Sequence, residues 1–107
     1  MISKVKFVTE KNKLDYEAVK LAALTLRSIN HDIRKDILKL LEHNKSMKVT
    51  DIYLNLKMQQ SETSINLAIL RKSGIVSTNR KGKEVYYSLN LSRIEHVVSF
   101  VDKWASL

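Results

Sequence analysis

The sequence predicts a mainly α-helical domain of the α+β class, in which four helices are followed by a small β-hairpin and a last helix. Three observations favour this order. Apolar residues recur at helical spacing in five segments, whereas a shorter segment alternates apolar and polar residues as a strand does. The 107 residues also include no proline and only two glycines, so few positions interrupt regular structure.

The first two predicted helices are amphipathic. One spans Leu14 to Ser28, and its apolar surface is broader than a single core-facing stripe requires, so it can serve both the core and a partner. The second begins after Asn30, a suitable N-cap, and runs to about His43. Its apolar residues at helical spacing are Ile33, Ile37, Leu40 and Leu41.

Two shorter helices are expected next. Thr50 can cap the third helix, and Val49 with Leu54 is placed to form a hydrophobic staple across its start. Ser61 can cap the fourth helix, which runs to Ser73. Only a few residues separate these two helices, as in a helix-turn-helix.

Both glycines fall where this arrangement needs them. Gly74 lies just past the fourth helix, in a position that favours the left-handed conformation. Gly82 supplies positive φ to a hairpin whose strands cover residues 75–80 and 83–90. Alternation places one set of side chains on the same face of the second strand, namely Val85, Tyr87 and Leu89.

A last helix is predicted from Leu91 to about Ala105, with one continuous apolar stripe. Two short helices followed directly by a basic hairpin match the layout of a winged helix-turn-helix. No linker or repeat divides the chain. We therefore expect one domain over residues 14–107, preceded by an N-terminal arm over residues 1–13 that can be mobile.

The charge of the chain favours a polyanionic partner. Lysine and arginine number 19 against 11 acidic residues, which gives a formal charge of +8. Nucleic acid and an anionic membrane are the two candidates. No apolar run approaches the roughly 18–20 residues that a membrane span needs, and no apolar signal core follows Met1, so we expect a cytoplasmic protein that binds no membrane.

Several classes of chemistry have no support in the sequence. The chain has no cysteine, which excludes disulfides, thiolate metal sites and cysteine nucleophiles. It also has no nucleophile elbow, phosphate loop, HExxH motif or dinucleotide fingerprint. Three isolated histidines, His31, His43 and His96, do not assemble a site by spacing and are expected at a helix start, the surface and an interface. We therefore expect no enzyme and no cofactor.

Two segments resemble a known family. NHDIRKDILKLLEHN (residues 30–44) and QQSETSINLAILRKSGIVSTNRKGKEVYYSLN (residues 59–90) are similar to the DNA-binding core of the ArsR-type, arsenic-repressor-like bacterial regulators. The resemblance implies a homodimer that pairs through its first and last helices, binds an operator duplex and usually represses transcription. Asp32, Glu62, Ile65 and Asn66 depart from the motif, so base preference does not transfer.

The resemblance also raises the question of metal sensing, which many members of the family perform. A cysteine pair on the third helix would fall in residues 49–53, where only Asp51 could ligate a metal. The last helix offers only Glu95, His96 and Asp102, whereas zinc needs about four converging ligands. We expect none of the familiar metal sites, although a metal at an atypical site stays open.

Recognition of DNA is expected from two groups of residues. Polar residues around the start of the fourth helix can hydrogen-bond base edges in the major groove, and basic residues at the wing tip can meet phosphate or the minor groove. The alternative is that they are caps, turn residues and a solvated basic surface. The candidate DNA-binding residues are Gln59, Gln60, Ser61, Ser64, Asn66, Arg71, Arg80, Lys81 and Lys83, with Lys45, Lys48 and Lys72 in support.

A homodimer on double-stranded DNA with a pseudo-palindromic operator is the predicted assembly, and its effector is unknown. The competing interpretation is a winged-helix module that binds another protein, for example through the face from Ile94 to Trp104. An aromatic ligand pocket around Phe100 and Trp104 is a further alternative to packing. The candidate dimer residues are Leu14, Ala18, Leu21, Ala22, Ile94, Val97, Val98, Val101 and Trp104.

Overall fold

The structure, a computed structural model, describes the backbone of residues 13–105 and the side chains of residues 16–103. Apart from Lys13, which begins a helix, the predicted N-terminal arm lies outside these residues. The described part contains five helices and three strands, in the predicted order with one strand in addition. Their bounds are α2 Lys13–Ile29, α3 Asp32–Asn44, β1 Ser46–Lys48, α4 Val49–Leu56, α5 Gln60–Lys72, β2 Val76–Lys81, β3 Glu84–Leu89 and α6 Leu91–Ala105.

The sheet has three antiparallel strands in the order β1-β3-β2. The hairpin of β2 and β3 is the predicted wing, and Gly82 in its two-residue loop has a φ of 65°. The strand β1 was not predicted, because three residues between two helices are too few to show alternation. It pairs Met47 with Tyr87 and so fastens the chain between α3 and α4 to the base of the wing.

Three predicted helix caps are wrong. The N-cap of α3 is His31, whose Nδ1 accepts a hydrogen bond from the backbone N–H of Ile33 at 3.3 Å, and Asn30 precedes it. α4 already begins at Val49, so Thr50 is a helical residue and the predicted staple cannot form. In α5 the N-cap is Gln59 and not Ser61. In each case the chain enters the helix one or two residues away from the best capping residue, because packing outweighs a cap of about 1 kcal/mol.

The end of α5 follows the prediction closely. Gly74 has a φ of 83°, its N–H donates to the carbonyl of Arg71 at 2.9 Å, and the N–H of Ile75 donates to the carbonyl of Leu70 at 3.2 Å. These two bonds form a Schellman motif, in which the left-handed glycine lets the chain turn back over the helix end. The side chains of Leu70 and Ile75 both enter the core, so the turn also directs β2 into the sheet.

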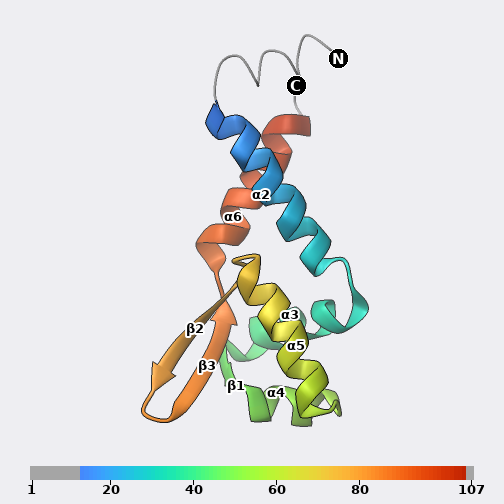
Figure 1. Cartoon of the computed structure of the whole chain (residues 1–107), viewed down its shortest axis with the longest axis vertical. Helices are drawn as coiled ribbons and strands as arrows, with labels where there is room; N and C mark the ends of the chain where they lie inside the picture. Colours follow the sequence, from blue (N-terminus) through green and yellow to red (C-terminus); the bar gives the residue numbers. More distant parts are fainter. Residues whose placement is uncertain (1–12, 106–107) are drawn as a thin grey trace.

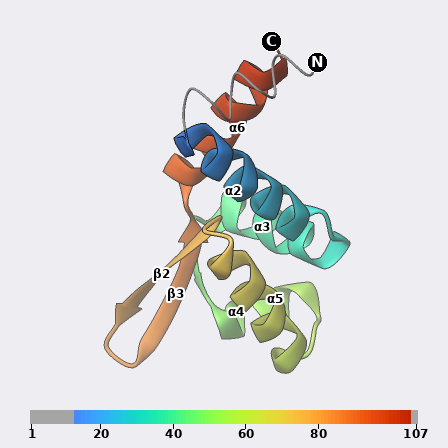
Figure 2. The same cartoon turned by 45° about the horizontal axis from the view of Figure 1, so that its top comes forward.

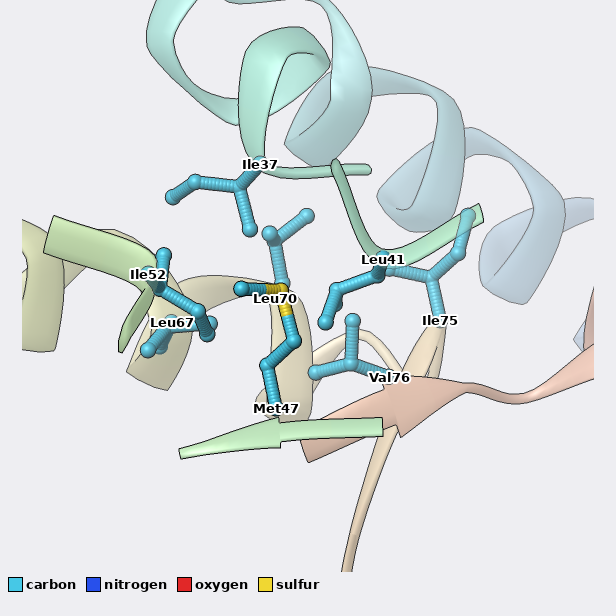
Figure 3. Packing of buried hydrophobic residues seen from close by; sticks show 8 residues of the cluster. All are labelled: Ile37, Leu41, Met47, Ile52, Leu67, Leu70, Ile75 and Val76. Carbon is cyan, nitrogen blue, oxygen red and sulfur yellow. The ribbon is translucent and has the colours of Figure 1, made fainter. Parts of the chain in front are cut away.

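The core lies where α3, α4 and α5 meet the sheet. Figure 3 shows its eight buried side chains converging from α3, β1, α4, α5 and the start of β2. Tyr87 and Leu89 of β3 pack against this cluster, as strand alternation predicts, while Val85 lies further along the wing and does not. The cluster consists of Ile37, Leu41, Met47, Ile52, Leu67, Leu70, Ile75 and Val76.

Two parts of the molecule extend from this core. The wing stands clear of the helices in both views (Figures 1 and 2). α2 and α6 pack against each other at the end of the molecule opposite α4 (Figure 1). The described helices include none that is both long and apolar enough to cross a membrane.

Candidate nucleic-acid interface

A three-residue turn joins α4 to α5. It begins at Lys57, whose φ of 54° lies in the left-handed region. The backbone N–H of Met58 donates to the carbonyl of Tyr53 across the end of α4, at 2.9 Å. Because α4 also packs against α5, the two helices and this turn form the predicted helix-turn-helix.

The first two turns of α5 bury one side and expose the other. Thr63 is buried, and its Oγ1 donates to the carbonyl of Gln59 at 3.0 Å. Leu67, one turn later, is fully buried in the core. Four of the predicted recognition residues lie exposed at the start of the helix, and these are Gln59, Gln60, Ser61 and Ser64.

Asn66 lies on the inner side of α5 and not with the other predicted recognition residues. Only 8% of it is exposed, and its Nδ2 donates to the carbonyl of Glu62 at 2.9 Å. Ile65, in contrast, is 62% exposed. Ile65 was not among the predicted recognition residues, although its spacing of four residues from Ser61 places both side chains on one face of the helix.

The N-terminus of α5 has backbone N–H groups available for a ligand. Gln59, the N-cap, makes no side-chain capping bond within the described residues, and Ser61 is the second residue of the helix. The first N–H groups of a helix have no partner inside it, and together with the helix dipole they attract anions. The exposed carboxylate of Glu62 in the same turn disfavours a phosphate directly beside it. The free N–H groups and exposed polar side chains of this end therefore suit hydrogen bonds to a ligand, and Glu62 limits where a phosphate can lie.

The wing tip is basic and exposed. Arg80, Lys81 and Lys83 are all exposed, and Glu84 pairs with Lys81 across the hairpin. The Nζ of Lys81 lies 5.2 Å from the centroid of the Tyr86 ring, a distance at which a cation and an aromatic ring attract each other. At an exposed site such a contact is worth only about 0.5–1 kcal/mol, so it leaves Lys81 free to turn toward an anion.

The start of α5 and the wing tip lie at the same end of the molecule. Figure 1 shows the hairpin loop and the first turn of α5 on the side away from α6, with α4 between them. The remaining predicted cations lie further from the start of α5. Arg71 is exposed in the last turn of α5, about 15 Å along the helix axis from its first turn. Lys72 lies beside it, Lys45 immediately precedes β1, and Lys48 is the last residue of that strand.

The predicted dimer residues differ widely in how exposed they are. Ala22 and Val97 are buried within the protomer because α2 packs against α6, so they are not free to meet a partner. Val98 and Val101 are 53% and 41% exposed. Half-buried positions are Ala18, Leu21 and Ile94, and the side chains of Leu14 and Trp104 lie outside the described residues.

Other apolar residues of the same two helices extend the exposed surface. Tyr16 is 51% exposed, and Leu24 and Leu26 are 41% and 44% exposed. Leu91, at the start of α6, is 64% exposed. The first predicted helix therefore does expose apolar side chains, as its broad apolar surface predicted. The exposed residues are not the ones predicted for the dimer interface.

The histidines do not converge. His31 caps α3, as expected for a residue at a helix start, and His43 and His96 are exposed on α3 and α6. Within residues 16–103, no three side chains of the metal-binding types come together as a group. The described side chains therefore offer no assembled ligand set for a metal ion.

Comparison with known proteins decides the family. The model of the bacterial regulatory proteins of the arsR family matches residues 31–78. The transcriptional repressor PagR of Bacillus anthracis is 31% identical to this chain, over 85% of this chain and 91% of PagR. The chain belongs to the ArsR family of bacterial regulatory proteins. The predicted resemblance is thus confirmed.

Two solved structures and another relative extend the comparison of this ArsR-family chain. The crystal structure of PagR has a TM-score of 0.70 and covers 80% of this chain and 98% of that one. An uncharacterized HTH-type transcriptional regulator of Methanocaldococcus jannaschii is 35% identical, over 77% of this chain and 92% of its own length. The homodimeric winged helix-turn-helix DNA-binding domain of Mb0332 from Mycobacterium bovis, 22% identical, has a TM-score of 0.71 and covers 89% of this chain and 87% of that one. The winged helix-turn-helix fold is therefore confirmed.

Proposed function

We propose that this ArsR-family chain is a sequence-specific DNA-binding transcriptional repressor that works as a homodimer. One observation carries the proposal: the exposed polar start of α5 and the exposed basic tip of the wing lie at the same end of the molecule (Figure 1). A duplex that receives α5 in its major groove would lie next to the wing, as in other winged helix-turn-helix proteins. PagR, a relative over most of the chain, is a transcriptional repressor.

The start of α5 would read the bases. Gln59 and Gln60 can donate to and accept from adenine, and Ser61 and Ser64 can bond to several base edges. Ile65 adds an apolar side chain on the same face, which suits the methyl group of thymine. Asn66 is excluded from this set because it is buried and already hydrogen-bonded.

The wing would supply affinity more than specificity. Arg80, Lys81 and Lys83 are placed to meet phosphates or the minor groove beside the major-groove site. Two chains carry 2 × 8 = 16 formal positive charges. Binding should therefore weaken steeply with salt, as it does when cations on a protein release counterions from DNA.

Dimerisation would proceed through the outward faces of α2 and α6. Apolar residues of both helices are exposed there, among them Tyr16 of α2 and Val98 and Val101 of α6, and a solved structure with the same fold is a homodimer. A two-fold axis would set two α5 helices about 34–36 Å apart, one turn of the duplex, so the operator would be pseudo-palindromic. No familiar metal site is proposed as the sensor, because the donor residues for one are missing from the sequence.

The experiment that tests the proposal is a binding-site selection on randomised duplexes with the full chain. A repressor of this kind should enrich a site with two inverted half-sites about 10 base pairs apart. The same experiment distinguishes the competing interpretation, a winged helix-turn-helix that binds another protein. Such a module would retain DNA weakly and enrich no sequence, and that result would overturn the proposal.

A further inference from the structure

A cavity of about 260 Å³ lies between α2, α3 and α5. It is bordered by the last turn of α5, at the opposite end of that helix from the proposed base-reading residues. The proposed function gives this cavity no role. Its lining combines cationic, apolar and hydroxyl side chains.

Three positively charged side chains from three different helices line the cavity. They are Arg27 of α2, Arg34 of α3 and Lys72 of α5. Among the described residues that line it, none is acidic. Cations gathered around a concave surface create a positive potential that attracts anions, and the low-dielectric walls of a cleft strengthen it.

The guanidinium of Arg34 has an unused hydrogen-bond donor. Its Nε is shielded from solvent and has no hydrogen-bond partner within the described residues. A buried donor without a partner is unfavourable, and native proteins rarely leave one in place. The planar guanidinium can bind an acidic group through two of its nitrogens together, so an anion with two oxygens that displaces the groups covering Nε would supply the missing acceptor.

The remaining side chains indicate that the ligand has an apolar part. Leu24 and Ile69 line the cavity and are 41% and 38% exposed, so both offer apolar surface to an occupant. The hydroxyl groups of Ser28 and Ser73 are buried, and they donate to the carbonyls of Thr25 and Leu70, at 2.7 Å and 2.8 Å. The serines are therefore already satisfied, which leaves charge and apolar contact as the means of recognition.

We propose that this cavity binds a small organic anion, in which a carboxylate or phosphate group is carried on a short apolar body. The acidic group would lie against the guanidinium of Arg34, with Arg27 and Lys72 adding charge. The apolar body would cover Leu24 and Ile69. The cavity is near the lower end of the sizes that hold small molecules, which restricts the ligand to a few carbon atoms beyond its acidic group.

The proposal can be tested on the full chain without DNA, so its outcome does not depend on the proposed function. Methyl-labelled protein is titrated with hexanoate, hexyl phosphate, hexanamide and inorganic phosphate, while NMR follows the methyl groups of Leu24 and Ile69. Saturable shifts of both residues with hexanoate or hexyl phosphate are expected, and the stronger of the two identifies the acidic group. Equal binding of neutral hexanamide, equal binding of inorganic phosphate, or no saturable shift with any probe would each overturn the proposal.

Substitutions of the cationic residues test whether the probe binds in this cavity. Arg34→Met should weaken binding of the preferred probe about tenfold, the effect of removing one charge-assisted hydrogen bond, and Lys72→Met about two- to fivefold, the effect of removing one exposed charge. Lys72 is exposed on α5, so its variant should fold even if the Arg34 variant does not. Lys39→Met is the matched control, since Lys39 is an exposed cation of α3 that does not line this cavity. Unchanged affinity in the Lys72 variant, or an equal decrease in the control, would contradict the assignment.

Discussion

The guanidinium of Arg93 lies against Gly74, with its Cζ 3.0 Å from the position that a Cβ on this glycine would occupy. Gly74 ends α5 and Arg93 belongs to the first turn of α6, so the contact joins the proposed DNA-reading helix to the proposed dimer helix. The φ of 83° favours glycine here, and a Cβ at this position would also crowd the end of the Arg93 side chain.

Replacing Gly74 with alanine should therefore lower the stability of the fold more than the same change at the other glycine. Gly82→Ala is the matched control, because Gly82 also has a positive φ but no atom lies within 4 Å of its Cβ position. The left-handed conformation should cost about 1–2 kcal/mol in either variant, and displacement of Arg93 adds to this cost only for Gly74→Ala. Urea unfolding of both variants measures the difference, and equal destabilisation would show that the Arg93 contact contributes nothing.

The three basic residues of the wing tip should set part of the salt dependence of DNA binding. Changing Arg80, Lys81 and Lys83 together to alanine should weaken binding and make the plot of log affinity against log salt shallower, by about 0.9 for each phosphate that is no longer neutralised. Fluorescence polarisation over a salt series gives both quantities. The control changes Lys35 and Lys39 to alanine, two exposed cations of α3. A slope unchanged in the wing variant would refute the role of the wing.

The exposed Ile65 should contribute to base preference through a thymine methyl group. Ile65→Ala should reduce the preference for the selected site by about 1 kcal/mol, or roughly fivefold, without changing the salt slope. Replacing each thymine of the site in turn with deoxyuridine removes one methyl group. At one position this replacement should weaken binding as much as Ile65→Ala does. At that position, combining the replacement with Ile65→Ala should weaken binding no further. Leu54→Ala is the control, since Leu54 is 63% exposed on α4. If the variant discriminates thymine from uracil as the parent does, Ile65 makes no such contact.

The exposed apolar residues of α6 should be necessary for dimer formation. Changing Val98 and Val101 to aspartate would bury uncompensated charges at the interface and should weaken the dimer by about 3–5 kcal/mol. Sedimentation equilibrium measures the dissociation constant, and circular dichroism checks that each protomer stays folded. Leu54→Asp places the same charge on a comparably exposed apolar residue outside α2 and α6. A dimer that persists in the double variant would assign the interface elsewhere.

The sequence predicted the features that depend on the conformational preferences of neighbouring residues alone. Gly74 and Gly82 marked the end of α5 and the hairpin loop, because the left-handed conformation at each is met most easily by glycine. The helical stripes placed all five helices to within a few residues. The turn between α4 and α5 carries no such mark, since Lys57 adopts the left-handed conformation that a glycine would have signalled.

Other features depended on contacts between distant residues. β1 forms because β3 offers it an edge, and nothing in residues 46–48 alone indicates this. The inward orientation of Asn66 follows from how α5 packs on the core, which a motif comparison does not reveal. Likewise, Ala22 and Val97 share apolar stripes with truly exposed residues, and only the packing of α2 on α6 separates the two sets.

The pairing of Met47 with Tyr87 limits how far the spacing within a proposed DNA half-site can change. Because this strand pairing ties the chain leading into α4 directly to the hairpin, the helix-turn-helix cannot tilt away from the wing without breaking backbone hydrogen bonds. The distance between the two proposed DNA contacts, the start of α5 and the wing tip, is thus fixed within one protomer. A single base pair inserted inside a half-site should be far more damaging than one inserted between half-sites, where only the contact between protomers has to adjust.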